Sequence, residues 1–311
     1  MASSPVSQSL VSLSNELAAL VASSAGAVVA VQGRPRFNSS GVHWSPGVVV
    51  TAEHTLRHDD DIYVTTGAGD RLPAELAGRD PGTDLAVLRV KDLAVPTIVK
   101  AEDNAQRPGN LVVAVGRNKD STNAALGVIS SLGGPSQTWR GGKLDQVIRL
   151  DLALHPVAAG GAVVDAAGKT IGMATPVLSR VAVFAVPNAT IDRVAQALLA
   201  HGRLPQGYLG AGLQPIRLPE HLKESLGLSV ASGLMTVSVD ENAPAGKAGL
   251  LIGDVLVELG GHIVDRIESL KPLLAESVGK TLSVRILRGG KLMTLDIAVA
   301  ERPGRKSHGD R

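Results

Sequence analysis

Two side chains of this 311-residue chain could together move a proton. His54 follows a β-branched run at residues 48–51, and Asp84 lies thirty positions further along. An imidazole can take the proton from a hydroxyl group, while a buried carboxylate holds the imidazole in the required tautomer and stabilises its charged form. Isolated His and Asp residues are usually structural, so this interpretation depends on the sequence around them.

The flanking segments resemble a known protease family. Residues 83–88 are similar to the TDLAVL block of the HtrA (DegP/DegS-like) serine proteases, and the segment around His54 is similar to their TNNHVV block. Residues 150–165 resemble the nucleophile loop of trypsin-fold proteases, which ends Ser-Gly-Gly in that family. The resemblance implies a triad in the chymotrypsin order, with His54 first, Asp84 second and position 159 third.

Position 159 is an alanine, followed by Gly160 and Gly161. By the resemblance it stands where the attacking serine belongs. A methyl group cannot form an acyl-enzyme, and loss of such a nucleophile costs on the order of 10⁶ in turnover. No other Ser, Thr or Cys lies between Asp151 and Asp165, so the chain is predicted to be inactive as a protease.

The resemblance also implies an oxyanion loop made of Val157, Ala158 and Ala159. The family usually has glycine two residues before the nucleophile, and its N–H group stabilises the oxyanion. Valine is β-branched and tolerates an unusual loop backbone poorly. The primary specificity pocket is predicted at Ala153, its base, and Phe184, and it would favour small or aliphatic side chains.

Two functions remain open. The first is an HtrA-like pseudoprotease that binds extended peptides and C-termini without cleaving them, as a scaffold or chaperone-like protein. The second is an active HtrA-type endopeptidase in protein quality control that carries a Ser-to-Ala substitution at position 159. A laboratory substitution would alter position 159 alone. Because Val157 also differs from the glycine that the family usually has, the sequence favours the pseudoprotease.

A further resemblance covers the C-terminal third of the chain. Residues 207–213 resemble the carboxylate-binding loop and second strand of HtrA PDZ domains, and residues 243–257 and 267–274 resemble later blocks of the same domain. The resemblance implies that an extended peptide adds to a sheet edge while loop N–H groups bind its C-terminal carboxylate. The implied contact residues are Tyr208, Leu209, Gly210, Ala211, Leu213, Leu270 and Leu274.

Composition is consistent with a mainly β protein. Hydrophobic residues make up 44% of the chain and aromatic residues only 2%, which is typical of barrels packed with small aliphatic side chains. The formal net charge of +2 gives no reason to expect a nucleic-acid partner. The chain has no cysteine, which excludes disulfides, thiol catalysis and Cys-ligated zinc. We expect no cofactor and no metal.

Short β-branched runs between residues 27 and 187, separated by Gly, Pro, Asn and Asp, predict an all-β double barrel. The predicted fold is mainly β, a chymotrypsin-like double β-barrel followed by a small α+β PDZ domain. The predicted divisions are a segment at 1–24 with a short helix at 14–21, a protease-fold domain at 25–201 that ends in a helix at 188–201, a linker at 202–206, a PDZ domain at 207–302 and a disordered tail at 303–311.

Location and assembly are less constrained by the sequence. The apolar stretch 17–31 is short for a bilayer and is interrupted by Ser23, Ser24 and Gly26, so no integral membrane span is predicted. The N-terminus lacks the basic region of a signal peptide, which predicts a cytoplasmic protein unless a signal has been removed. The resemblance implies a periplasmic or envelope location.

The expected partners are extended or unfolded polypeptides and protein C-termini, with an active HtrA relative as a further candidate. A homo-oligomer, trimeric by the resemblance, stays open. HtrA relatives commonly form trimers through aromatic residues near the N-terminus, and this chain has only Phe37 before Trp44.

Overall fold

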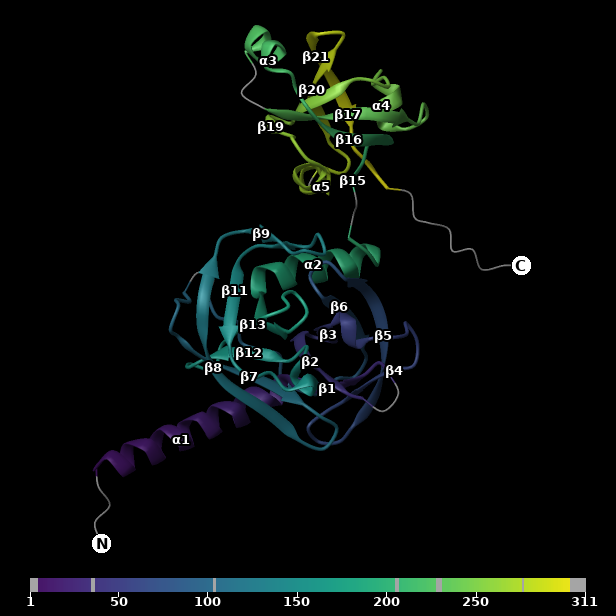
Figure 1. Ribbon diagram of the computed structural model, residues 1–311. Coiled ribbons are helices and arrows are strands. Elements are labelled where there is room, and N and C mark those ends of the chain that lie inside the picture. The colour runs from purple at the N-terminus through teal and green to yellow at the C-terminus, as the bar shows by residue number, and fades with distance from the viewer. Residues whose placement is uncertain are drawn as a thin grey trace. The chain divides into compact units, whose positions relative to one another are not determined.

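The computed structural model describes residues 5–34, 37–102, 105–204, 207–227, 231–275 and 277–302. The chain divides into two compact units, residues 1–204 and 205–311, and each is described by itself. Figure 1 shows the two barrels of the first unit and the smaller sheet of the second. The predicted tail at 303–311 and the last part of the predicted linker, 205–206, lie outside the described residues.

The first barrel closes in the strand order β1-β2-β3-β6-β5-β4. Its interior is filled by small branched side chains such as Val29, Val49 and Val64, which are fully buried and suit a pleated, tightly curved sheet. The strands are β1 (Val28–Gln32), β2 (Ser39–Ser45), β3 (Val48–Ala52), β4 (Ile62–Thr65), β5 (Arg71–Asp80) and β6 (Leu85–Val90).

The second barrel closes in the order β11-β14-β13-β12-β7-β8. Two short strands, β9 (Ser136–Gln137) and β10 (Lys143–Leu144), pair with each other in the connection after β8. The barrel strands are β7 (Leu111–Arg117), β8 (Thr122–Gly133), β11 (Val147–Asp151), β12 (Ala162–Asp165), β13 (Thr170–Thr175) and β14 (Val183–Pro187). The predicted double barrel is confirmed.

Helix α2 (Asn188–His201) contacts β5 and β6 of one barrel and β13 and β14 of the other, and Figure 1 shows it lying along both. Its bounds are those predicted from the sequence. Ile191, Val194 and Leu198 are fully buried in the core between the barrels. Gly202 follows in the left-handed conformation (φ 71°) and ends the helix.

Helix α1 (Pro5–Ser24) is longer than predicted. The expected short helix at 14–21 was wrong in its extent, because the helix begins nine residues earlier, at Pro5, and ends three residues later, at Ser24. Proline is tolerated in the first turn of a helix, so Pro5 can begin it. Leu17 and Leu20 pack against the core between the barrels, whereas Leu10 is 63% exposed. The far end of α1 points away from both barrels in Figure 1.

The N-terminal region also bears on the predicted absence of a membrane span. The segment Gln8–Ala27 reaches the length and apolarity of a spanning helix, with a mean hydropathy of 1.2 and 11% of that window buried. Helix length and composition alone are weak evidence for a span. The absence of a span therefore stays a prediction.

The second unit is one curved sheet in the order β16-β17-β18-β20-β21, with β19 paired to β18. A separate pair joins β15 to β22. Leu234, Leu256 and Ile286 are fully buried at its centre. The elements are β15 (Gly207–Tyr208), β16 (Ala211–Arg217), α3 (Glu220–Leu226), β17 (Ser232–Val239), α4 (Pro244–Lys247), β18 (Val255–Leu259), β19 (His262–Ile263), α5 (Ile267–Ala275), β20 (Thr281–Arg288), β21 (Lys291–Ala298) and β22 (Ala300–Glu301).

An ion pair between the buried Asp254 and the half-buried Arg288 holds one end of this sheet. The carboxylate of Asp254 accepts hydrogen bonds of 2.7 Å from Arg288 Nε, from Arg288 Nη2 and from the N–H group of Leu251. Burial by itself would raise the pKa of Asp254, but these hydrogen bonds and the charge of Arg288 outweigh it and lower the pKa below its ordinary value. Arg288 Nη2 also donates to the carbonyl of Gly249, so the pair ties the loop at 249–254 to the end of β20.

Candidate functional site

His54 and Asp84 lie in direct contact, as a general-base pair requires. His54 sits in the short 3₁₀ turn η2 (Glu53–Thr55) directly after β3, and Asp84 immediately precedes β6. Nδ1 of His54 is 2.9 Å from each carboxylate oxygen, and the His54 backbone N–H group donates to Oδ1 at 2.9 Å. Because Nδ1 is used in this way, Nε2 is the ring nitrogen left for a reacting group.

The surroundings of Asp84 hold its carboxylate against His54. Asp84 is fully buried and has a positive φ of 59°, a conformation that Asp adopts more readily than most residues. Thr175, at the end of β13 in the other barrel, donates from Oγ1 to Oδ2 at 2.5 Å. The carboxylate is therefore held from both barrels, while the His54 side chain stays 24% exposed.

Ala159 lies in the core between the two barrels with 2% of its surface exposed. The N–H group of Ser40 donates to its carbonyl at 3.0 Å. Gly160 follows with φ 83°, and a Cβ at that position would stand 2.3 Å from the carbonyl oxygen of Ser40 and 2.8 Å from the backbone nitrogen of Ala52. Only glycine allows the loop to lie this close to the end of β3, the strand that leads to His54.

The N–H groups of the predicted oxyanion loop are all used inside the loop. It forms a 3₁₀ turn, η3 (Pro156–Ala158), in which Ala158 N–H donates to the carbonyl of His155 at 2.8 Å and Ala159 N–H to that of Pro156 at 3.3 Å. The Val157 N–H group donates to Nδ1 of His155 at 3.2 Å. In this conformation the loop offers an anion no pair of convergent donors, which an oxyanion hole requires.

Ser40 fixes this loop, a role that the sequence analysis missed. Its buried hydroxyl donates to the carbonyl of Val157 at 2.6 Å and accepts the N–H group of Arg117 at 2.8 Å. Its own carbonyl accepts the Thr51 hydroxyl at 2.6 Å. His155 was missed as well, although a polar side chain directly before Pro156 is the usual signal for a residue that caps a helical turn.

The two predicted pocket residues lie in different surroundings. Ala153 is exposed in the connection between β11 and η3. Phe184 is half-buried on β14, opposite Arg149 and Thr175 in the sheet, and it packs against the core cluster that contains Ala159. Their assignment to a specificity pocket stays a prediction.

The predicted carboxylate loop of the second unit has the opposite arrangement of backbone groups. The carbonyl of Leu209 accepts Ala245 N–H and that of Gly210 accepts Asp240 N–H, each at 2.8 Å. Within the part of the chain that the structure describes, the N–H groups of Leu209 and Gly210 donate to no protein group. Gly210 has φ 79°, and a Cβ there would lie 2.0 Å from the Cβ of Ala243.

The strand that follows this loop borders a potential groove. β16 is the outermost strand of its sheet, and helix α5 contacts both β15 and β16. Of the predicted groove residues, Leu213 is half-buried, and Leu270 and Leu274 are 5% and 8% exposed in one apolar cluster. Tyr208 instead lines a cavity beside α4. The assignment of these residues to a peptide groove stays a prediction.

Comparison with known proteins agrees with both units. The "Trypsin-like peptidase domain" family matches residues 39–173, and the "PDZ domain" family matches residues 207–299. A serine-to-alanine variant of the HtrA-type protease AlgW, solved with a tripeptide, is 30% identical, covers 91% of this chain and 96% of its own, and has a TM-score of 0.72. The chain belongs to the HtrA family.

Other HtrA proteins show the same relationship. AlgW solved with a decapeptide is 28% identical over 92% of this chain and 98% of that one, with a TM-score of 0.73. The "Probable periplasmic serine endoprotease DegP-like" of Rhizobium meliloti (strain 1021) is 32% identical over 279 residues, which is 87% of this chain and 54% of the relative. The chain therefore spans about half the length of such curated relatives.

As an HtrA protein, this chain keeps the fold and the imidazole–carboxylate pair but has a methyl group at residue 159. It also has a loop whose N–H groups are bonded internally. The PDZ loop keeps two unbonded N–H donors. The two units therefore differ in the backbone N–H donors that these loops leave unbonded.

Proposed function

We propose that this HtrA protein binds extended polypeptides and protein C-termini without cleaving them. The observation that carries the proposal is the loop of residues 157–159, which has a methyl group at the nucleophile position and N–H groups that are all bonded to His155 or Pro156. A hydrolase of this fold needs both an attacking oxygen and oxyanion donors. The chain lacks the first and does not present the second.

The binding half of the proposal is supported by the second unit. Leu209 and Gly210 present N–H groups beside the open edge of β16, which suits the terminal carboxylate of a strand that pairs with that edge. Leu213, Leu270 and Leu274 would line the pocket for the last side chain. Two modest sites on one chain gain affinity for a long unfolded polypeptide through avidity.

A second function keeps one observation in its favour. The His54–Asp84 pair is geometrically intact, with hydrogen bonds of 2.9 Å and a supporting bond from Thr175. A protein that lost its nucleophile long ago has no catalytic reason to keep this pair. The alternative is therefore an active endopeptidase in quality control in which a serine has been replaced at Ala159.

The experiment that separates the two functions restores the nucleophile in steps. Ala159→Ser alone, and Ala159→Ser together with Val157→Gly, are assayed on unfolded casein and with a fluorophosphonate that labels activated serines. The double variant Ala159→Ser/His54→Ala is the inactive control. We expect no labelling and no hydrolysis from the single variant, because the loop donors stay internal. Rapid hydrolysis by the single variant would establish the alternative.

Binding is tested on the unaltered chain with peptides that end in a free carboxylate and with their C-amidated counterparts. We expect the free acids to bind at least tenfold more tightly, because Leu209 and Gly210 donate to the carboxylate. Equal affinity for acid and amide would refute binding of C-termini.

Location and assembly are further parts of the proposal. We place the protein in the cell envelope, because relatives such as the Bartonella henselae protein are named periplasmic, and that one is 31% identical over 83% of this chain. The apolar helix α1 fits a signal or an anchor. Cell fractionation tests the location, and sedimentation of the purified chain tests whether it forms a trimer or a complex with an active relative.

A further inference from the structure

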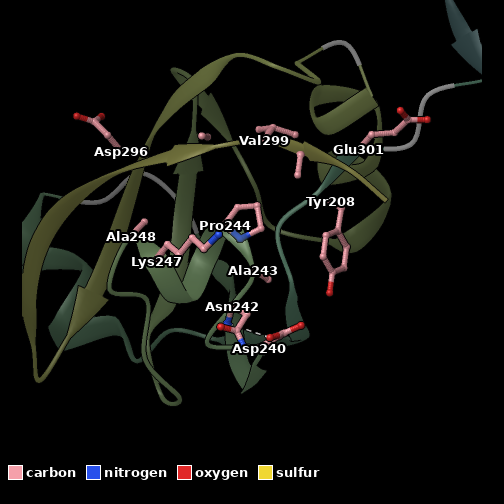
Figure 2. A pocket seen from close by; sticks show the side chains of 12 residues that line it. Tyr208, Asp240, Asn242, Ala243, Pro244, Lys247, Ala248, Asp296, Val299 and Glu301 are labelled. Carbon is pink, nitrogen blue, oxygen red and sulfur yellow. Dashed lines mark hydrogen bonds between the residues drawn. The ribbon is translucent and has the colours of Figure 1, made fainter. Parts of the chain in front are cut away.

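The second unit contains a cavity of about 590 Å³ that the proposed function does not use. It lies beside α4, the end of β21, β22 and the Tyr208 side chain, and Figure 2 shows these elements around it. The proposed C-terminus groove is bordered by other elements, β16 and α5. The cavity is therefore a separate feature of the same unit.

The charged side chains of this cavity are mostly acidic. Asp240, Asp296 and Glu301 line it, with Lys247 as the single basic residue. Asp240 accepts the N–H group of Asn242 at 3.0 Å, the bond drawn in Figure 2. Asp296 is exposed, and its carboxylate has no hydrogen bond or ion pair to any residue that the structure describes. In a chain with a net charge of +2, this rim is a local excess of negative charge.

The walls between these charges suit a long side chain with a positive end. They consist of small apolar residues that leave depth for an aliphatic stem, which lysine and arginine possess. Tyr208 projects its ring beside this space in Figure 2, and an aromatic face attracts a cation. The apolar wall residues are Ala243, Pro244, Ala248, Ala298, Val299 and Ala300.

One side of the cavity is a sheet edge. β21 is the outermost strand and pairs only with β20 within the described sheet. In an antiparallel pair, every second residue turns its backbone N–H and C=O groups away from its partner strand. Such an edge can pair with an extended chain, and Asp296 and Ala298 belong to both the edge strand and the cavity wall.

We propose that this cavity is a second polypeptide site, which takes a lysine or arginine side chain from an extended basic segment of another protein. The segment lies along β21, its aliphatic stem contacts the small wall residues, and its cationic end reaches Asp296 on that strand. The site uses the edge of β21 and the C-terminus groove uses that of β16, although Asp240 of the cavity also donates its N–H group to the carbonyl of Gly210.

The test uses the full chain and a fluorescent peptide of alternating lysine and alanine that is N-acetylated and C-amidated. Without a free carboxylate, this probe has nothing to offer Leu209 and Gly210. Asp296→Lys is compared with Glu224→Lys, an equal charge change on the exposed surface of α3. We expect Asp296→Lys to weaken binding at least tenfold and Glu224→Lys less than twofold.

Two further arms complete the experiment. Ala248→Phe fills the cavity without changing its charge, and we expect it to weaken binding of the lysine peptide to a similar extent. A glutamate–alanine peptide is expected not to bind. No binding of the lysine peptide by the unaltered chain, or equal losses in Asp296→Lys and Glu224→Lys, would overturn the proposal. A neutral peptide with a free C-terminus reports on the groove separately, and its affinity should be the same in all three variants.

Discussion

The predicted oxyanion loop at residues 155–161 and the predicted carboxylate loop at 208–211 direct their backbone groups differently. In the first loop, Ser40 donates hydrogen bonds to the carbonyls of Val157 and Ala159. The N–H groups of residues 157–159 donate to His155 and Pro156 within the same loop. In the second loop, the carbonyls of Leu209 and Gly210 accept hydrogen bonds from Ala245 and Asp240, and within the described residues the N–H groups of Leu209 and Gly210 donate to no protein group.

The difference teaches that neighbouring contacts decide whether a loop offers donors. Each loop has its carbonyls fixed by the surrounding structure. The second can point its N–H groups outward because Gly210 adopts a left-handed backbone. Position 157 carries a valine, for which such a conformation is strained, and the first loop closes into a 3₁₀ turn instead. Four predictions test this comparison.

The largest effect is expected from Gly160→Ala in the first loop. The added Cβ would stand 2.3 Å from the Ser40 carbonyl at a φ of 83°, so we expect a loss of at least about 3 kcal/mol in unfolding free energy. Both tryptophans, Trp44 and Trp139, lie in the first unit, so their fluorescence in urea follows that unit. Gly134→Ala, with open space around it, is the control. Equal stability of the two variants would contradict the loop packing.

The matching change in the second loop is Gly210→Ala. Its Cβ would collide with Ala243 at 2.0 Å, so the loop must shift and its N–H donors move with it. We expect affinity for peptides with a free C-terminus to fall at least tenfold, measured by calorimetry. Gly261→Ala has a similar φ of 82° but no atom within 4 Å, so it separates backbone strain from the collision. The proposed role of the loop fails if both variants bind normally.

A smaller effect is expected from His155→Ala. The Val157 N–H group would lose its acceptor, and its amide hydrogen exchange should become roughly tenfold faster, at a stability loss of about 1 kcal/mol. Hydrogen-exchange NMR of the Val157 amide measures this directly. His262→Ala, in the other unit, should leave that amide unchanged. Unaltered exchange in His155→Ala would mean that the side chain does not hold the donor inward.

The smallest effect concerns acid and the Asp254–Arg288 ion pair of the second unit. Asp254 has a lowered pKa in the folded unit, so its ionised form stabilises the fold above the unfolded pKa of about 3.9, and this contribution disappears as pH falls through the folded pKa. The Asp254→Asn variant should therefore have a lower unfolding free energy than the unaltered chain at pH 7, and its unfolding free energy should fall less as the pH is lowered. Calorimetry of the unit from pH 7 to 3 tests this, with Glu224→Gln as control. If the unfolding free energy falls equally with pH in Asp254→Asn and in Glu224→Gln, Asp254 is not the source of the acid sensitivity.

Sequence patterns predicted the long, strongly patterned elements well. Helix α2 has the predicted bounds, because a regular apolar face is a local signal. β5 (Arg71–Asp80) has little strand signal of its own, since Pro73, Glu75 and Gly78 are poor strand formers. It is a strand because β4 and β6 pair with it on either side in a closed barrel.

The candidate site divides in a similar way. His54, Asp84 and Ala159 could be found from sequence because each sits within a recognisable block. His155 and Ser40 could not be assigned roles, because their hydrogen bonds join residues that are adjacent only after folding, such as Ser40 and Val157. The same holds for the cavity beside Tyr208, which brings residues near 240 together with residues near 300.

The amino-acid sequence by itself determined which chemical groups exist: an imidazole, a carboxylate, a methyl group at residue 159 and glycines at the two sharp turns. Those are covalent facts that no fold can change. Only the tertiary structure decided the direction of each backbone N–H group, because that direction follows from contacts between distant strands. The first loop therefore closed on itself while the second stayed open.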